Sequence, residues 1–230
     1  MEELREEIHI INKPLHMTSH DVIDQVRRKT GERRVGHAGT LDPLASGILI
    51  VLVGRGATRR QAEFMGLPKE YIAEVTFGSV SETYDAEGPI TQQASTEELQ
   101  LLTEAQIKEA LKQFVGNIQQ RPPIHSAIKV GGKALYKKAR KGEITAEDVP
   151  PREVTIDNIE LLDFTPATTS SAATARLKIN CQKGVYIRSL AHDLGRKAVN
   201  TGAYLSGLER TAVGPHTIDT AMTLDEFIQA

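Results

Sequence analysis

The order of apolar and polar positions predicts strands and one clear helix in the first third of the chain. Residues 48–53, ILIVLV, form a continuous apolar run of the length of a buried strand. Residues 70–78, EYIAEVTFG, alternate as a half-buried antiparallel strand does. Residues 19–31 repeat apolar positions at helical spacing, with Ser19 as the expected N-cap and Gly31 just past the helix end.

The rest of the chain adds further elements without a regular alternation of strands and helices. Strands are predicted over 8–14, 152–164 and the start of 174–198, and Thr103 with Gln106 forms the capping box of a helix. This order favours an α+β fold with a largely antiparallel mixed sheet flanked by helices, built as one domain over residues 1–230. The proline- and glycine-punctuated stretch at about 121–152 is expected to be an insertion.

Composition narrows the class of protein. Hydrophobic residues make up 40% of the 230-residue chain, enough for a core, and the longest apolar run is far too short to span a membrane. The acidic N-terminus lacks the layout of a signal peptide. A single cysteine, Cys181, excludes an internal disulfide or a cysteine-based zinc site, and the histidines show no metal-ligand spacing. We therefore expect a cytoplasmic protein without a metal and without a membrane anchor.

Charge is unevenly distributed although the net charge is only −2. Residues 121–152 contain eight basic and three acidic residues, whereas 82–110 contain seven acidic and one basic. A basic stretch of this kind is either a solvated helix face or a contact for nucleic acid, and the charge pattern alone does not choose between them.

The sequence GHAGTLDPLASG, residues 36–47, places a single carboxylate, Asp42, among small residues and directly before a proline. Taken alone, such a loop favours a turn whose aspartate caps the backbone. The other interpretation is a shaped surface that presents Asp42 to a ligand, with the small residues leaving space for it.

The full stretch GHAGTLDPLASGILIVLVG closely resembles the catalytic motif of the TruB-type family of pseudouridine synthases, which act on uridine 55 of tRNA. Further segments resemble motifs of that family in the same order: NKPLHMTSHDV, KEYIAEVTFG, RPPIHSAIKVGGKALYKKARKGE, KGVYIRSLAHDLG and YLSGLERTAVG. The resemblance covers nearly the whole chain. It implies the pseudouridine synthase fold and the isomerisation of uridine to pseudouridine without an organic cofactor.

The resemblance also implies roles for individual residues. Asp42 matches the nucleophile, which adds either to the uracil ring or to the sugar C1′. Arg188 matches an arginine that keeps this aspartate ionised and aimed. Tyr71 matches a tyrosine that stacks on the target base and assists proton removal at C5. Without the family, Arg188 would be a surface charge and Tyr71 a packed aromatic in a strand.

Four more residues match the substrate-binding positions of the family. His37 corresponds to a histidine that contacts the RNA where the target base has flipped out of its stack. Tyr186 and Leu208 correspond to residues lining the base pocket, and Lys13 to a lysine supporting the site. From the sequence pattern alone, Tyr186 and Leu208 would be core residues and Lys13 a surface lysine at a strand end.

The basic insertion resembles the part of the family that contacts the T-arm stem-loop of tRNA through phosphates. The expected backbone contacts are Lys129, Lys133, Lys137, Lys138, Arg140 and Lys141. We expect a monomer without an obligatory protein partner and without the C-terminal PUA domain that many relatives carry. Two positions depart from the family: His16 replaces a common glycine, and Ala38 replaces a frequent threonine.

Three other functions are compatible with parts of this pattern. The same chemistry could act on another RNA, as in guide-dependent relatives. A non-catalytic RNA-binding protein would not need the aspartate. A glycosidase usually needs two carboxylates flanking one bond, and the matching motifs supply no second one.

Overall fold

The computed structural model describes residues 6–126, 129–130, 133–135, 139 and 141–230. Contacts divide the chain into two compact units. Unit 1 comprises Met1–Ile72 and Leu208–Ala230, and unit 2 comprises Ala73–Gly207. Two strands, β4 (Lys69–Phe77) and β12 (Ala203–Val213), contribute residues to both units. The single catalytic domain expected from the sequence stays a prediction.

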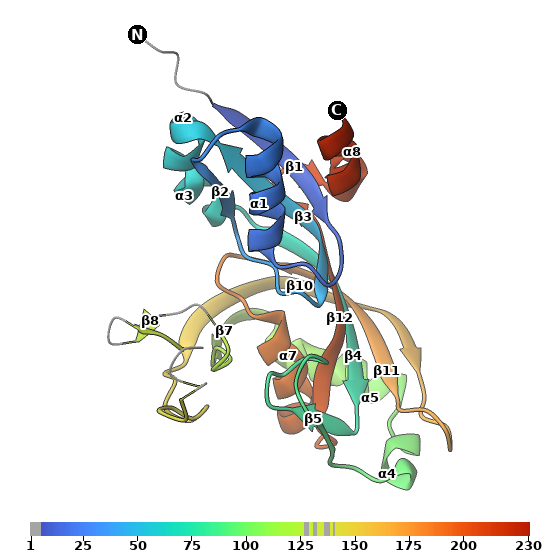
Figure 1. Cartoon of the computed structure of the whole chain (residues 1–230). Coiled ribbons are helices and arrows are strands. Elements are labelled where there is room, and N and C mark those ends of the chain that lie inside the picture. The colour runs from blue at the N-terminus through green and yellow to red at the C-terminus, as the bar shows by residue number, and fades with distance from the viewer. Residues whose placement is uncertain (1–5, 127–128, 131–132, 136–138, 140) are drawn as a thin grey trace. The chain divides into compact units, whose positions relative to one another are not determined.

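Unit 1 is built on strands in the order β14-β1-β3-β12-β4, with β2 paired to β3 and β13 paired to β12 (Figure 1). Its further elements are β1 (Glu7–Lys13), α1 (Ser19–Thr30), β2 (Val35–Ala38), β3 (Ala45–Val53), α2 (Gly54–Arg59), α3 (Gln61–Gly66), β13 (His216–Thr217), η3 (Ile218–Thr220), β14 (Met222–Thr223) and α8 (Leu224–Gln229). β3 is antiparallel to β1 and parallel to β12. The predicted mixed sheet is therefore confirmed.

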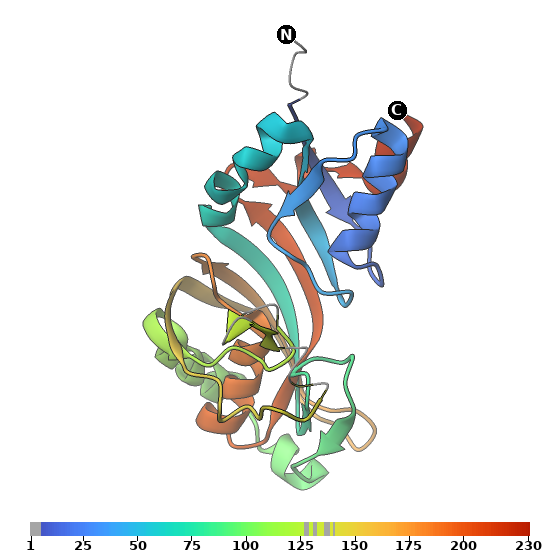
Figure 2. The same ribbon diagram turned by 60° about the vertical axis from the view of Figure 1, so that its left-hand side comes forward.

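The strand β3 is buried on both faces, as its continuous apolar run predicts. Its odd-numbered positions 49–53 pack with Val26 of α1 and Phe227 of α8. Its even-numbered positions 48–52 pack with Ala57 of α2 and Phe64 of α3. Alternate side chains of a strand point to opposite faces, so one strand supplies both layers of the core. Figure 2 shows α1 and the pair α2–α3 on opposite sides of these strands.

Helix α1 begins one residue earlier than the sequence suggested. The predicted N-cap Ser19 is wrong, because Thr18 has the extended cap conformation and accepts a hydrogen bond from the Asp21 N–H. The Asp21 carboxylate accepts from the Thr18 N–H, which completes a capping box. Gly31 ends the helix at φ 68° and donates to the Arg27 carbonyl, as predicted. Ser19 is thereby free of the capping role.

His16 has the left-handed backbone (φ 63°), and its N–H donates to the Pro43 carbonyl at 2.8 Å. A non-glycine residue in this conformation costs about 1 kcal/mol, which explains why a glycine suits this position. We expect His16→Gly to raise the free energy of unfolding by about 0.5–1 kcal/mol, measured by urea denaturation. The matched change His20→Gly, at an exposed helical position of α1, should lower it by about 1 kcal/mol. A similar loss for both variants would contradict the strain at His16.

Unit 2 continues the strand order β12-β4-β11-β10-β7. Its elements are β5 (Ser79–Ser81), β6 (Ile90–Gln92), α4 (Thr96–Gln100), α5 (Glu104–Leu111), η1 (Lys112–Phe114), β7 (Gly116–Gln120), β8 (Lys129–Val130), β9 (Lys133–Ala134), β10 (Arg152–Thr165), β11 (Thr174–Cys181), α7 (Ile187–Asp193) and η2 (Leu194–Ala198). β10 pairs antiparallel with both β7 and β11. Together with unit 1, this confirms the predicted α+β class.

The capping box predicted in unit 2 is confirmed. The capping box of Thr103 and Gln106 starts α5, and Cys181 is a buried thiol in β11. In the insertion, β8 and β9 form a short hairpin. Residues 127–128, 131–132, 136–138 and 140 of the insertion lie outside the described residues. No helix within the described ranges is long and apolar enough to cross a bilayer.

Candidate active site

In unit 1, Asp42 lies in the connection between β2 and β3. The Asp42 carbonyl accepts a hydrogen bond from the Ala45 N–H at 3.0 Å, so the aspartate sits on a tight turn that leads directly into β3. Asp42 is partly exposed, whereas its neighbour Leu41 is buried in the protein. Proline at position 43 restricts the backbone of Asp42 to extended conformations. The carboxylate is thus carried on a short turn with little backbone freedom.

Leu208 and Tyr71 lie on the strands next to this turn. β12 runs parallel to β3 and places Leu208 opposite Ala45, the residue that closes the Asp42 turn. The neighbouring strand β4 is linked to β12 by a hydrogen bond from Thr211 Oγ1 to Glu70 Oε1 at 2.9 Å, one residue before Tyr71. Tyr71 is buried and Leu208 partly exposed. Unit 1 therefore holds three predicted site residues: Asp42 on the turn before β3, and Leu208 and Tyr71 on the neighbouring strands β12 and β4.

Gly47 is needed by the fold itself rather than by a ligand. Its φ is +100°, and a Cβ at this position would lie 2.3 Å from the Arg210 carbonyl oxygen. The space beside Gly47 is therefore filled by the backbone of β12, and the interpretation of the small residues as space for a ligand is wrong at this glycine. The parallel contact of β3 with β12 requires a residue without a side chain at this point.

Arg210 is a buried arginine that the sequence analysis did not select. It is 1% exposed. Its Nε donates to the Ile48 carbonyl at 2.7 Å, and its Nη2 donates to the Gly39 carbonyl at 3.0 Å. The guanidinium therefore ties the start of the Asp42 loop to β3. By strand alternation, Arg210 shares a face of β12 with Leu208 and Ala212, and these apolar neighbours are the signal that could have indicated an inward-facing arginine.

His37 lies on β2, paired with Val51, and its carbonyl accepts from Gln61 Nε2 at 2.7 Å. Burial, aided by the positive charges of Arg210 and His20, lowers the pKa of His37. The imidazole is therefore neutral at pH 7, which suits a flat ring that stacks rather than a cation that binds phosphate.

Lys13 is fully buried, so the interpretation as a surface lysine is wrong. Its Nζ donates to the carbonyls of Pro14 at 2.8 Å and Met17 at 2.6 Å. These two bonds fix the turn that contains His16, and the His16 N–H in turn holds Pro43. Lys13 thus supports the Asp42 turn indirectly, through the turn that contains His16.

In unit 2, Arg188 is held by a network of buried polar groups. Its Nη1 lies 3.3 Å from Asp85 Oδ2 and donates to the Thr83 carbonyl at 3.2 Å. Its Nη2 donates to the His125 carbonyl at 3.1 Å. Asp85 also accepts from Thr83 Oγ1 at 2.5 Å and from the Glu87 N–H at 3.1 Å. The side chains of Arg188 and Asp85 are 8% and 1% exposed, so this is a buried ion pair with its hydrogen bonds made.

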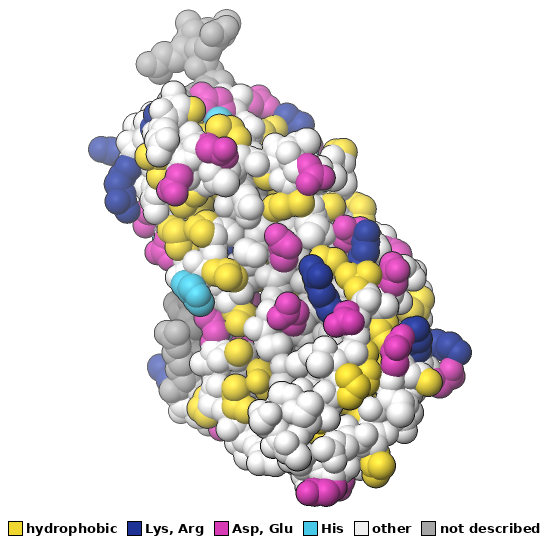
Figure 3. All heavy atoms as spheres, turned by 90° about the vertical axis from the view of Figure 1, so that its right-hand side faces the viewer, with side chains coloured by type: hydrophobic (Ala, Val, Ile, Leu, Met, Phe, Trp, Pro, Cys, Tyr) yellow, Lys and Arg dark blue, Asp and Glu magenta, His cyan; other side chains and the backbone are white. Residues whose placement is uncertain are grey.

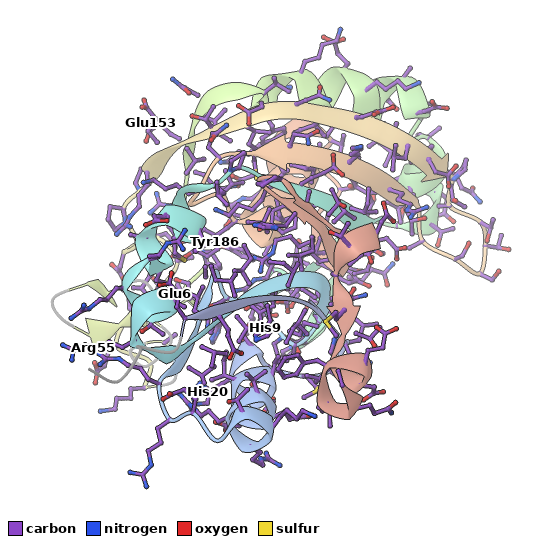
Figure 4. All side chains as sticks on the ribbon, turned by 90° about the horizontal axis from the view of Figure 1, so that it is seen from above. Glu6, His9, His20, Arg55, Glu153 and Tyr186 are labelled. Atoms are coloured by element: carbon purple, nitrogen blue, oxygen red, sulfur yellow. The ribbon has the colours of Figure 1, made fainter. Side chains whose placement is uncertain are left out.

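Tyr186 is positioned through its backbone by Gln120. The Tyr186 N–H donates to Gln120 Oε1 at 2.8 Å, and Gln120 Nε2 donates back to the Tyr186 carbonyl at 3.0 Å. One buried amide thus satisfies both backbone groups of the residue that precedes α7. Tyr186, labelled in Figure 4, is itself partly exposed.

Sequence reasoning missed Asp85 and Gln120 for different reasons. Asp85 falls within the acidic stretch 82–110, where exposed carboxylates are the ordinary expectation. The signal that could have found it is the spacing Thr-x-Asp in a tight turn, where a threonine hydroxyl reaches a carboxylate two residues on. Gln120 ends a strand, where an exposed amide is the ordinary expectation, and only the tertiary structure shows its partner.

The basic insertion is described only in part. Arg121 anchors its returning end, because its Nη1 donates to the carbonyls of Ala146, Glu147 and Val149. Lys141 is exposed, with its Nζ 3.9 Å from Glu143 Oε1. The side chains of the other predicted phosphate contacts are not among those that the structure describes. These contacts are Lys129, Lys133, Lys137, Lys138 and Arg140. In the part of the chain that the structure describes, no group of three or more His, Cys, Asp or Glu could hold a metal ion.

Comparison with known proteins places this architecture in a family. The model of the TruB family pseudouridylate synthase (N terminal domain) matches residues 27–187. The tRNA pseudouridine synthase B of Parabacteroides distasonis is 42% identical over 100% of this chain and 96% of its own length. That of Corynebacterium diphtheriae is 41% identical over 95% of this chain and 71% of its own length.

A solved structure agrees with the sequence relatives. A chain from the crystal structure of a Cbf5-Nop10-Gar1 complex matches with a TM-score of 0.71 and 27% identity, over 96% of this chain. The present chain spans about half, 53%, of that solved chain. The fold is that of the pseudouridine synthases. Within this class, the chain belongs to the TruB family.

Proposed function

We propose that the protein converts uridine 55 in the T-loop of tRNA to pseudouridine in the cytoplasm, with Asp42 as the nucleophile. The observation that carries the proposal is the restrained turn that bears Asp42 and closes at Ala45, opposite Leu208 of β12. Relatives that bear the name tRNA pseudouridine synthase B and share 41–42% identity support the substrate.

The reaction is an isomerisation, so atoms and electrons balance without a co-reactant. The bond between N1 of uracil and C1′ of ribose breaks, and a bond between C5 and C1′ forms. C5 loses a proton and N1 gains one. The Asp42 carboxylate forms a temporary bond, either to the uracil ring or to C1′, and leaves at the end. This chemistry does not call for a metal or an organic cofactor.

The other candidate residues take supporting parts in the proposal. Tyr71 stacks on the base and assists removal of the C5 proton, while Tyr186 and Leu208 line the base pocket. Neutral His37 occupies the space that the flipped base leaves. Arg188 acts with Asp42 by favouring the ionised carboxylate. Its rigid hydrogen bonding to Asp85, Thr83 and His125 supports this part, because a fixed guanidinium loses little entropy when a second anion approaches.

RNA affinity is assigned to the basic insertion, with the T-arm stem-loop as its partner. Positive side chains release counterions from RNA phosphates, so the binding should weaken as salt rises. The face shown in Figure 3 carries acidic and basic side chains interspersed, so it offers RNA phosphates no continuous basic patch. The protein acts as a monomer and needs no obligatory protein partner in this proposal.

One assay tests the proposed function. An unmodified tRNA transcript is incubated with the protein in EDTA, and pseudouridine is mapped along the RNA. We expect conversion at position 55 and none in a transcript carrying cytidine there. Absence of pseudouridine at every uridine would overturn the enzyme assignment. Conversion only after addition of a guide RNA would instead favour the function of the guide-dependent relatives.

A further inference from the structure

The loop before and after Asp42 is held at every second residue by groups of unit 1. The Gly39 carbonyl accepts from Arg210 Nη2 at 3.0 Å. The Leu41 carbonyl accepts from Ser19 Oγ at 3.0 Å. The Pro43 carbonyl accepts from the His16 N–H at 2.8 Å. We call these three hydrogen bonds the carbonyl latch.

Ser19 holds Leu41 by two hydrogen bonds, one of which belongs to the carbonyl latch. Its Oγ donates to the Leu41 carbonyl and also accepts from the Leu41 N–H at 2.8 Å. Ser19 is 2% exposed, and Leu41 is buried as well. Both backbone groups of the residue directly before Asp42 are therefore satisfied by one hydroxyl, away from water. Thr18 caps the helix instead, which leaves the Ser19 hydroxyl for the loop.

The loop before Asp42 needs these hydrogen bonds because few of its side chains pack into the core. The loop contains Gly39, Thr40 and Leu41 before the aspartate, and only the Leu41 side chain of these is buried in the core. Side-chain packing alone therefore gives the loop few contacts that define the direction of its backbone. Hydrogen bonds to the backbone carbonyls of residues 39, 41 and 43 supply that direction, and none of these three bonds uses the side chain of Asp42.

We infer that Ser19 is a positioning residue for Asp42: it fixes the Leu41 peptide groups and thereby the direction of the nucleophilic carboxylate. The inference rests on the proposed function. A nucleophile must lie close to the attacked atom and in line with it, and a displacement of about 1 Å can cost about 100-fold in rate. Loss of the Ser19 hydroxyl should therefore lower kcat more than it changes RNA affinity.

The test compares Ser19→Ala with Thr18→Ala. Both variants remove one hydroxyl from the start of α1, marked by the label of His20 in Figure 4, but only the first touches the loop. At a temperature where both are folded, kcat at saturating tRNA and the Kd for tRNA are measured. We expect Ser19→Ala to lower kcat about 10- to 100-fold with Kd nearly unchanged, and Thr18→Ala to keep the wild-type kcat.

A second readout does not depend on activity. The Leu41 amide, bonded to Ser19 Oγ, should exchange its hydrogen slowly in the wild type and in Thr18→Ala, and much faster in Ser19→Ala. Equal kcat in the two variants, or unchanged Leu41 exchange in Ser19→Ala, would overturn the inference. Failure of the wild type to form pseudouridine would instead overturn the proposed function while the exchange result still tests the carbonyl latch.

Discussion

Asp42→Asn is expected to abolish pseudouridine formation while leaving tRNA binding intact. The amide keeps the shape of the carboxylate but cannot form and release the covalent bond to the substrate. Loss of a nucleophile of this kind reduces turnover by at least about 10⁴-fold. Removing one negative charge also cannot weaken contacts to RNA phosphates, so the Kd should stay the same or fall slightly.

Single-turnover conversion of tRNA and a filter-binding titration measure these two quantities. Asp219→Asn, which neutralises an exposed carboxylate of the same unit, is the matched control and should behave as the wild type. Retained turnover in Asp42→Asn would refute the assignment of the nucleophile. Lost binding together with lost turnover would indicate a damaged fold, which circular dichroism would reveal.

Arg188→Ala is expected to lower the free energy of unfolding by about 3–5 kcal/mol, because it leaves Asp85 as a buried carboxylate without its cation. The same change exposes the carbonyls of Thr83 and His125 to an empty space without donors. Urea denaturation measures the loss. Arg176→Ala, which removes an exposed arginine of β11 in the same unit, should change stability by less than about 0.5 kcal/mol.

Arg188→Lys extends this prediction to function, and a double change tests the coupling between Arg188 and Asp85. Lysine restores a charge near Asp85, but its donors lie on a single nitrogen that cannot take the places of both Nη1 and Nη2, so stability should recover in part and pseudouridine formation should not. Combining Arg188→Gln with Asp85→Asn removes both charges, and the double variant should be less destabilised than the sum of the single changes. Additive losses would contradict the coupling of the two residues.

The backbone arrangement of the chain follows largely from its pattern. The run at 48–53 is long enough for a strand and apolar throughout, which requires a partner layer on each face, and both layers are present. Gly31 at a helix end and the capping box at Thr103 need only local chemistry. Such features depend on neighbours in sequence, so the sequence reveals them.

The parts that the sequence did not reveal depend on distant partners. Ser19 looks like a helix cap until Leu41, twenty-two residues later, lies against it. Lys13 has the sequence pattern of a surface residue, but in the structure its Nζ donates to the Pro14 carbonyl. Gly47 looks like room for a ligand until the backbone of Arg210 fills the space. In each case a polar or small residue meets a backbone group that no local pattern predicts.

The residues that begin the insertion are joined to the first turn of α7 by several hydrogen bonds. Gln120 holds Tyr186, Ser189 Oγ donates to the Arg121 carbonyl, and the His125 carbonyl accepts from Arg188. Any displacement of residues 120–125 therefore displaces partners of the side chains expected to meet the target base. If the insertion binds RNA as proposed, a shift of residues 120–125 on binding would be passed directly to Tyr186 and Arg188 through these bonds.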